Sequence, residues 1–369
     1  MSESAKPDLA ALRAQLDRVD ADLVSLAARR QEIVSTIGQL KQGVGRQVRD
    51  FRRERQVLDH VRRRAVETGL DPELAEELLK RLIDASLARQ EQERGQRTGR
   101  GRGQRALVIG GAGRLGGWLA DFLDNQGFNV LLADPALADD REQGRFSDWR
   151  HAPHAVDLTV VACPIAVSAG IIEALSDRGQ EGLVLEVASV KSGLIDTLRK
   201  AATNGLRICA AHPMFGPDTR LLAGRNVLLM DVGCRDAVEA ARALFDDTMA
   251  ELHEIDIDRH DRLMALVLGM SHALNIAFFA ALAESGLPAA ELNAAASTTF
   301  ARQLSIARNV AAENPALYFE IQSLNHHGQW SRQLLADAVS SLSRAVDESR
   351  PDAFITAMTK GRKYLEELG

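Results

Sequence analysis

A short glycine-rich segment constrains the fold of this chain more than any other feature. Gly111, Gly113 and Gly116 have the spacing GxGxxG, directly after the apolar run Ala106–Ile109 and before an amphipathic stretch. The first glycine permits a tight turn, the second lets backbone N–H groups approach a pyrophosphate, and the third lets the helix pack against the strand. The motif alone is weak, but a strand before it and a helix after it are the context that it requires. We therefore expect a Rossmann-type domain whose cofactor contacts are Gly111, Ala112, Gly113, Arg114, Leu115 and Gly116.

The end of the next apolar run predicts which cofactor binds. Asp134 follows FNVLLA, about 20 residues beyond the glycines, where a carboxylate accepts hydrogen bonds from a ribose 2′-hydroxyl. An anion there would repel a 2′-phosphate, and Pro135 and Ala136 follow it in place of an arginine. The residues therefore favour NAD over NADP. The alternative is that Asp134 is only a turn or cap residue.

Apolar patterning predicts a multidomain chain. The first part has helical periodicity, the middle alternates short apolar runs with amphipathic stretches, and the end is helical throughout. Near-continuous apolar runs are typical of strands buried on both faces of a parallel sheet. The predicted segments are a helical domain over 1–94, a flexible glycine-rich linker over 95–104, a Rossmann domain over 105–257 and a helical substrate or dimerisation domain over 258–369.

Bulk properties exclude several classes of protein. The composition is ordinary for a soluble protein, and no signal peptide is evident. No run of roughly 18 apolar residues occurs, which argues against a membrane span. Three cysteines without metal-ligand spacing fit a reduced, cytoplasmic setting. Residues 1–104 are slightly basic, with 21 Lys and Arg against 17 Asp and Glu, but acids alternate with the cations, which argues against nucleic acid. His326 and His327 are adjacent and cannot share a helical face, so we expect no metal site.

The first domain combines an overlong helix with cations in its apolar stripe. Leucine, valine and isoleucine recur every three or four residues over about 8–42, and shorter helices are predicted over about 52–67 and 72–93. A helix of that length spans about 50 Å, too long to be covered by two short helices, so we expect an intertwined homodimer. Arg30 interrupts the stripe and needs an anionic partner, because an unpaired buried charge is costly. A partner carboxylate, a register-setting polar residue or a site that grips a small dicarboxylate would account for it.

These segments resemble the AroQ-type chorismate mutases. The resemblance covers about residues 8–92 through LAALRAQLDRVDADLVSLAARR, IGQLK, VRDFRRER and IDASLARQ. It implies that Arg13 of the partner subunit and Arg30 hold the substrate carboxylates, while Lys41 and Gln90 face the ether oxygen. The remaining polar wall would comprise Asp50, Arg53, Glu54 and Ser86, with Glu54 toward the substrate hydroxyl. Because position 90 is Gln and not Glu, mutase activity is expected to persist through neutral pH.

A histidine follows a predicted strand of the Rossmann domain. His212 lies directly after LRICAA, at the carboxyl edge of the sheet where ligands bind in open α/β folds. Histidine there suits general acid or base catalysis near neutral pH. Ser189 and Lys191 take the equivalent place after the preceding strand, which favours a catalytic His212 over a histidine satisfied in a loop.

The blocks GGAGRLGG, VASVK, AAHPMFGPD, HDRLMALV and ENPALYFEI resemble the prephenate dehydrogenases over roughly residues 105–369. The resemblance implies NAD-dependent oxidative decarboxylation of prephenate, with His212 accepting the hydroxyl proton and Ser189 orienting His212. It also implies an arginine that holds a prephenate carboxylate. Arg308 is one residue off the expected offset, and Arg302 is the fallback. Further predicted pocket residues are Lys191, His260 and Tyr318.

Together the two resemblances predict a bifunctional enzyme of tyrosine biosynthesis. Two alternatives remain: a dehydrogenase whose helical domain only dimerises or regulates, and a non-catalytic NAD-sensing protein. The full cation set disfavours the first, and His212 with Ser189 disfavours the second. The residues leave open whether arogenate is also a substrate, and whether tyrosine inhibits.

Overall fold

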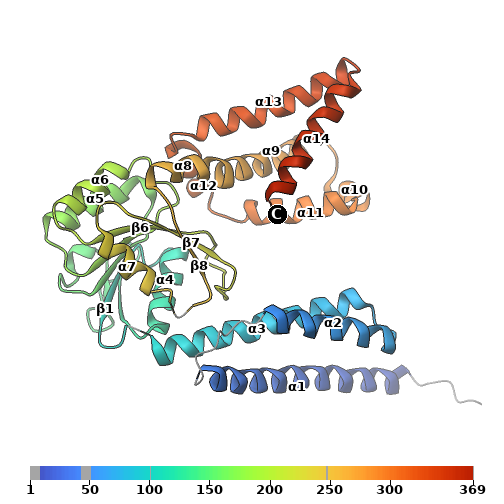
Figure 1. The fold of residues 1–369 in the computed structure, drawn as a ribbon, viewed down its shortest axis with the longest axis horizontal. Coiled ribbons are helices and arrows are strands. Elements are labelled where there is room, and N and C mark those ends of the chain that lie inside the picture. Colours follow the sequence, from blue (N-terminus) through green and yellow to red (C-terminus); the bar gives the residue numbers. More distant parts are fainter. Residues whose placement is uncertain (1–8, 43–50, 100, 247, 369) are drawn as a thin grey trace, which may run out of the picture.

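The computed structural model describes residues 9–42, 51–99, 101–246 and 248–368. Three helices are followed by an α/β unit with one sheet and then by a second group of helices (Figure 1). The multidomain fold expected from the apolar patterning is confirmed.

The N-terminal helices pack as an elongated group. Figure 1 shows α1 (Leu9–Gln42) running beside α3 (Pro72–Thr98), with α2 (Phe51–Thr68) packed on α3. Asp71 starts α3, because its carboxylate accepts the Glu73 N–H at 3.1 Å. The apolar stripe of α1 is left largely uncovered within one chain, and Leu16 and Leu23 are 60% and 59% exposed.

The predicted linker is more ordered than its composition indicated. The third helix continues to Thr98, five residues beyond the expected end, because the Arg and Gln residues there are good helix formers. Gly101 then donates its N–H to the Gln126 carbonyl at 3.1 Å. A Cβ atom at Gly101 would lie 2.2 Å from the Phe128 ring, so a glycine is needed for this close approach. Within the segment predicted as a flexible linker over 95–104, α3 therefore extends to Thr98 and Gly101 is packed.

The central sheet has eight strands in the order β3-β2-β1-β4-β5-β6-β7-β8. All neighbours are parallel except β6 and β7. The chain turns to opposite sides of β1, so the crevice at its carboxyl end is the switch point where such sheets bind ligands. The strands are β1 (Arg105–Ile109), β2 (Asn129–Ala133), β3 (Arg145–Phe146), β4 (Leu158–Val161), β5 (Leu183–Glu186), β6 (Ile208–Pro213), β7 (Asn226–Met230) and β8 (Glu251–Glu254).

Helices cover both faces of the sheet, as near-continuous apolar strands require. One apolar core lies between the sheet and α5 with α6, and a second lies between the sheet and α4 with α7. These helices are α4 (Arg114–Asn125), α5 (Ile165–Asp177), α6 (Ile195–Thr203) and α7 (Arg235–Ala243), and a short helical turn η1 (Trp149–His151) follows β3.

The C-terminal part is helical. Its helices are α8 (Ile257–Met264), the π-helical segment η2 (Ala265–Met270), α9 (Ser271–Glu284), α10 (Ala289–Ala294), α11 (Thr298–Ala311), α12 (Pro315–Leu324), α13 (Gly328–Asp347) and α14 (Pro351–Leu368). The π turn frees the Gly269 carbonyl, which accepts the Gln322 amide at 2.7 Å.

The helix formed by α8, η2 and α9 corrects one sequence expectation. Ile257–Glu284 is long and apolar enough to cross a membrane by length and composition. The absence of a run of roughly 18 apolar residues argues against a membrane span, but Ser271, His272 and Asn275, which interrupt the apolar run here, carry no charge. A single helix of this kind is a weak indication, since helices of soluble proteins pass the same test.

Candidate functional site

The glycine-rich turn has the close packing that the motif predicts. A Cβ atom at Gly116 would lie 2.0 Å from the Gly110 carbonyl oxygen, so only glycine lets α4 approach β1 this closely. The residue with positive φ is Gly110, at +90°, and not Gly111. The tight-turn role therefore belongs to Gly110, because a side chain there would also meet the Ala162 carbonyl. At the N-cap of α4, Gly113 offers no capping side chain, which leaves the first N–H groups of the helix for an anion.

Asp134 connects the end of β2 to this turn. Its carboxylate accepts the Ala136 N–H at 2.9 Å and the Ala112 N–H at 3.3 Å. These are turn contacts, as the alternative interpretation expected. A carboxylate has about four acceptor positions, so they leave capacity for a hydroxyl ligand.

Two other predicted cofactor residues are occupied differently. The Arg114 guanidinium pairs with Asp218 at 2.9 Å and with Glu313 at 2.7 Å, so it links the α/β unit to the C-terminal helices. Leu115 is half-buried and packs against the core beneath α4. The side chains of Arg114 and Leu115 are therefore engaged within the protein, which leaves their backbone for the predicted cofactor contacts.

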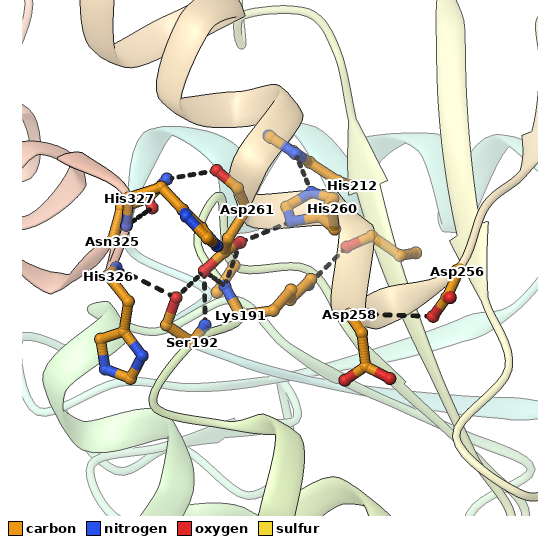
Figure 2. A network of polar contacts seen from close by, with 12 residues as sticks. Lys191, Ser192, His212, Asp256, Asp258, His260, Asp261, Asn325, His326 and His327 are labelled. Atoms are coloured by element: carbon orange, nitrogen blue, oxygen red, sulfur yellow. Dashed lines mark hydrogen bonds and ion pairs between the residues drawn. The ribbon is translucent and has the colours of Figure 1, made fainter. Parts of the chain in front are cut away.

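His212 is the central ionisable residue at the sheet edge. It ends β6, is 4% exposed, and its Nδ1 atom lies 2.9 Å from Nε2 of His260 on α8. His260 is fully buried, and its Nδ1 atom lies 2.6 Å from Oδ1 of Asp261. Figure 2 shows these three side chains in a row between β6 and α8. The α/β unit and the first C-terminal helix thus form this part of the site together.

Burial controls the charge of the two histidines. Desolvation, followed by the charges of His260 and Lys191, holds the pKa of His212 well below its usual range. Desolvation likewise lowers the pKa of His260. Both rings are therefore neutral at physiological pH. Although burial alone would raise it, hydrogen bonds from His260, Ser192 and Lys191 lower the pKa of Asp261 to about 2, so this carboxylate is charged.

Lys191 is not available to a substrate in this structure, contrary to the sequence expectation. Its side chain is fully buried, with Nζ 2.5 Å from Glu186 and 2.8 Å from the Ala211 carbonyl oxygen. A buried ammonium must be paired, and the last residue of β5 supplies its carboxylate. Lys191 therefore ties β5 to β6 beneath His212.

Ser189 follows β5 and is half-buried. We had expected it to orient His212, but His260 takes the Nδ1 atom of that ring. No hydrogen bond joins Ser189 to His212 in the described structure, so its orienting role stays a prediction.

The arginines predicted to hold a substrate carboxylate lie on α11. Arg302 and Arg308 are both exposed, and neither has an ion pair among the described residues. Tyr318 on α12 is half-buried and meets the ring of His272 edge-on, with 4.2 Å between centroids. Sequence analysis overlooked His272, whose Nδ1 atom is buried without a hydrogen-bond partner and whose pKa burial lowers to about 4. It lies inside an apolar run with no neighbouring motif, so nothing in the residue pattern marks it as a candidate.

In the N-terminal domain, α1 and α3 bring three predicted residues together. Arg30 donates to Ser86 Oγ and to the Leu82 carbonyl, both at 3.0 Å, and burial lowers the pKa of its guanidinium. Gln90 is buried and donates to the Val34 carbonyl at 2.6 Å. Arg13 is exposed on α1, 17 residues before Arg30 along the same helix. Asp50 lies outside the described residues, and so do the side chains of Lys41, Arg53 and Glu54.

Arg30 therefore has no carboxylate partner among the described residues of its own chain, only a hydroxyl and a carbonyl. A carboxylate partner within one chain is therefore disfavoured, whereas a register-setting polar partner and a substrate site both stay open. The described residues also contain no group of three or more His, Cys, Asp or Glu side chains that could hold a metal ion.

Three family models match the chain in succession. Residues 12–91 match chorismate mutase type II, residues 124–254 match the nucleotide-binding domain of prephenate dehydrogenase, and residues 256–360 match its dimerization domain. The T-protein of Enterobacter agglomerans is 28% identical over 85% of this chain and 81% of its own length. The chain belongs to the bifunctional chorismate mutase/prephenate dehydrogenase family.

Other relatives match the dehydrogenase part. The 4-amino-4-deoxyprephenate dehydrogenase of Streptomyces pristinaespiralis is 31% identical over 72% of this chain and 92% of its own length. The fold resembles the crystal structure of prephenate dehydrogenase from Aquifex aeolicus in complex with hydroxyphenyl propionate and NAD+, with a TM-score of 0.57 and 17% identity over 72% of this chain and 98% of that one. In this chorismate mutase/prephenate dehydrogenase the match to the nucleotide-binding domain begins at residue 124, after the glycine turn. The evidence for a cofactor site at that turn is therefore the geometry of the turn itself.

Proposed function

We propose that His212 is the general base of the dehydrogenase reaction and that the turn at Gly110–Gly116 binds NAD. The observation that carries this proposal is the buried, neutral His212 at the carboxyl edge of the sheet, on the side where α8 meets β6. A neutral imidazole can accept a proton, and this edge is where ligands bind in sheets of this topology.

The residues around the turn fit a dinucleotide. Gly116 lets α4 start directly against the turn, and the uncapped N–H groups of α4 favour an anion. Asp134 would accept the hydroxyls of the adenosine ribose and disfavour a 2′-phosphate. When bound, NAD supplies the acceptor for the two electrons that leave the substrate.

The residues of this chain would then transfer one proton and bind one carboxylate. Nε2 of His212 would take the proton of the ring hydroxyl as that carbon is oxidised. The ring carboxylate leaves as CO2, its bonding electrons complete the aromatic ring, and the ring oxygen takes the proton back from His212 to give 4-hydroxyphenylpyruvate. Arg308, or Arg302 as the fallback, would hold the substrate side-chain carboxylate. Both are exposed and unpaired among the described residues, so both are free to bind an anion.

The mutase site would be shared by two copies of the chain. Arg30, Ser86 and Gln90 lie together in one chain, whereas Arg13 lies far along an exposed helix. A second copy packed on the exposed stripe of α1 would cover its leucines and bring its own Arg13 to this group. We therefore propose a homodimer, as the dimerization-domain match also favours. Both reactions act on water-soluble acids, which fits a cytoplasmic enzyme.

The decisive experiment supplies chorismate and NAD to the wild type, Arg30→Ala and His212→Ala, and follows chorismate loss and NADH formation. Arg30→Ala should abolish NADH formation from chorismate but not from prephenate, whereas His212→Ala should abolish both. Each loss is expected to be on the order of 10²- to 10³-fold or more. If the wild type forms no NADH from prephenate, the proposal fails.

Two further sets of assays test which substrate is used and which arginine binds it. Arogenate and the 4-amino analogue of prephenate should be assayed beside prephenate, because a relative acts on the latter type of compound. Arg308→Ala and Arg302→Ala should separate the two arginines, since the carboxylate ligand is the one whose loss raises KM for prephenate about tenfold or more.

A further inference from the structure

The hydrogen bonds of His212 raise a question that its position alone does not answer: which ring nitrogen is the base. A neutral imidazole has one protonated nitrogen and one free nitrogen, and only the free one can accept a proton. The site therefore works only if the ring is held in one of its two tautomers.

The row of three side chains determines both tautomers. Asp261 is a charged carboxylate that can only accept, so the His260 Nδ1 atom 2.6 Å from it carries a proton. In neutral His260 the Nε2 atom is then free and accepts from His212 Nδ1, 2.9 Å away. With its proton on Nδ1, His212 keeps Nε2 free as the acceptor.

Asp261 is itself held firmly. Its carboxylate accepts the backbone N–H of Lys191 at 2.8 Å and of Ser192 at 2.5 Å, and it also accepts the Ser192 hydroxyl. Its own carbonyl accepts the Asn325 amide at 2.8 Å (Figure 2). The Lys191 and Ser192 donors come from the loop after β5. Ser192 donates its N–H and its hydroxyl to Oδ2, the oxygen turned away from His260, whereas the Lys191 N–H is shared between Oδ1 at 2.8 Å and Oδ2 at 3.0 Å.

We infer that His260 and Asp261 are positioning residues that fix His212 in the tautomer with a free Nε2 atom. The inference rests on the proposed role of His212 as the base. It differs from a Ser-His-Asp triad, because a second histidine stands between the carboxylate and the base. It also explains why the site is formed by both the sheet and α8, since the base lies on β6 and the two residues that orient it lie on α8.

Asp261→Asn is the sharpest test because the loop dictates how the amide must turn. The Ser192 N–H group faces Oδ2 alone and can only donate, so it would hold the amide oxygen there. The Lys191 N–H, now shared between both oxygens, would keep its bond to the amide oxygen, and the NH2 group would then face His260. That reverses both tautomers and puts a proton on Nε2 of His212. We expect kcat for prephenate to fall on the order of 10²- to 10⁴-fold, with KM changed less than about threefold.

A second variant separates the tautomer from a merely structural effect. In His260→Gln, the amide oxygen can still accept from His212 Nδ1 but no longer transmits the state of residue 261. This single change should lower kcat about tenfold or less. In the His260→Gln background, Asp261→Asn should add less than about threefold. If Asp261 only held the loop, its replacement would cost the same in both backgrounds.

Asp258→Asn is the matched control, since Asp258 lies on the same helix and pairs with Arg199 at the surface. It should leave both rates within about twofold. Binding of NAD, followed by fluorescence, checks that each variant retains a folded dehydrogenase domain.

Two readouts decide the inference. Imidazole ¹⁵N spectra should show a free Nε2 atom on His212 in the wild type and a protonated one in Asp261→Asn. A wild-type spectrum with the proton on Nε2, or full activity of Asp261→Asn, overturns the relay while leaving His212 as base if His212→Ala is inactive. If His212→Ala is active, the proposed function itself is wrong.

Discussion

In the N-terminal domain, the predicted site residues lie on long helices with an exposed apolar stripe, whereas in the dehydrogenase part the ionisable groups around the proposed base are buried and paired within one chain. Arg30 has only neutral partners on α3, and Arg13 lies on an exposed stretch of α1. His212 contacts His260, and His260 contacts Asp261, all within one chain.

The difference follows from the two kinds of chemistry. A site that grips a dianion needs cations, which tolerate water until the substrate arrives, so a second chain can supply part of it. A site that moves a proton needs a neutral base in one tautomer, which requires fixed neighbours and little water. We therefore expect the first site to depend on dimerisation and the second to depend on burial.

The largest effect should come from mixing two inactive mutase variants. Arg13→Ala and Arg30→Ala should each lower the mutase rate on the order of 10²- to 10³-fold. In a shared site, a mixed dimer of the two variants contains one intact site, with each chain supplying the arginine that the other lacks. Co-expressed chains should recover about a quarter of the wild-type rate, because about half of the dimers are mixed and one of their two sites is intact.

The control in that experiment is the prephenate-dependent NADH rate, which should equal that of the wild type in each variant and in the mixture. Absence of recovery in a mixture shown to contain mixed dimers would mean that Arg13 and Arg30 serve the same chain, and the comparison drawn above would fail.

The sequence predicted the elements better than their contacts. The three N-terminal helices, the sheet and the helical end follow from periodicity, and Gly116 follows from a motif whose physical reason is local. Lys191 was misassigned because its burial depends on Glu186, five residues earlier, and on the neighbouring strand β6. The role of Asp261 could not be predicted, because its partners come from the loop after β5 and from Asn325, which meet only in the folded chain.

The glycine turn gives a similar lesson on a smaller scale. The spacing GxGxxG placed the tight turn at Gly111, yet positive φ occurs at Gly110, where the strand ends and the Ala162 carbonyl is close. The motif locates the turn, and the neighbouring strand decides which glycine adopts the left-handed conformation.

A smaller effect is expected at the cofactor site, which sharpens the contrast from the dehydrogenase side. Asp134→Asn should raise KM for NAD about tenfold and reduce the preference over NADP, because a neutral amide accepts ribose hydroxyls less strongly and no longer repels a phosphate. Asp139→Asn is a suitable control, since Asp139 accepts the Ser147 N–H in the nearby loop. Mutase kinetics should be unchanged in both, and an unaltered KM for NAD in Asp134→Asn would assign this residue to the turn alone.

The smallest effect is the pH dependence of the two rates between pH 5 and 8, measured on the same preparation. The base must be unprotonated, and burial holds the pKa of His212 below 6.5, so kcat/KM for prephenate should fall only at a pH below that value. Stability has the same sign: His212 and His260 are neutral when buried and gain protons on unfolding, so the free energy of unfolding also decreases as the pH falls below about 6.5. Circular dichroism at each pH separates the two effects.

The mutase rate should stay level through neutral pH, because Gln90 has no proton to lose. A dehydrogenase midpoint above pH 6.5, or a mutase rate that collapses above pH 6 in a folded protein, would remove the contrast between a site built on fixed charges and one built on a neutral base.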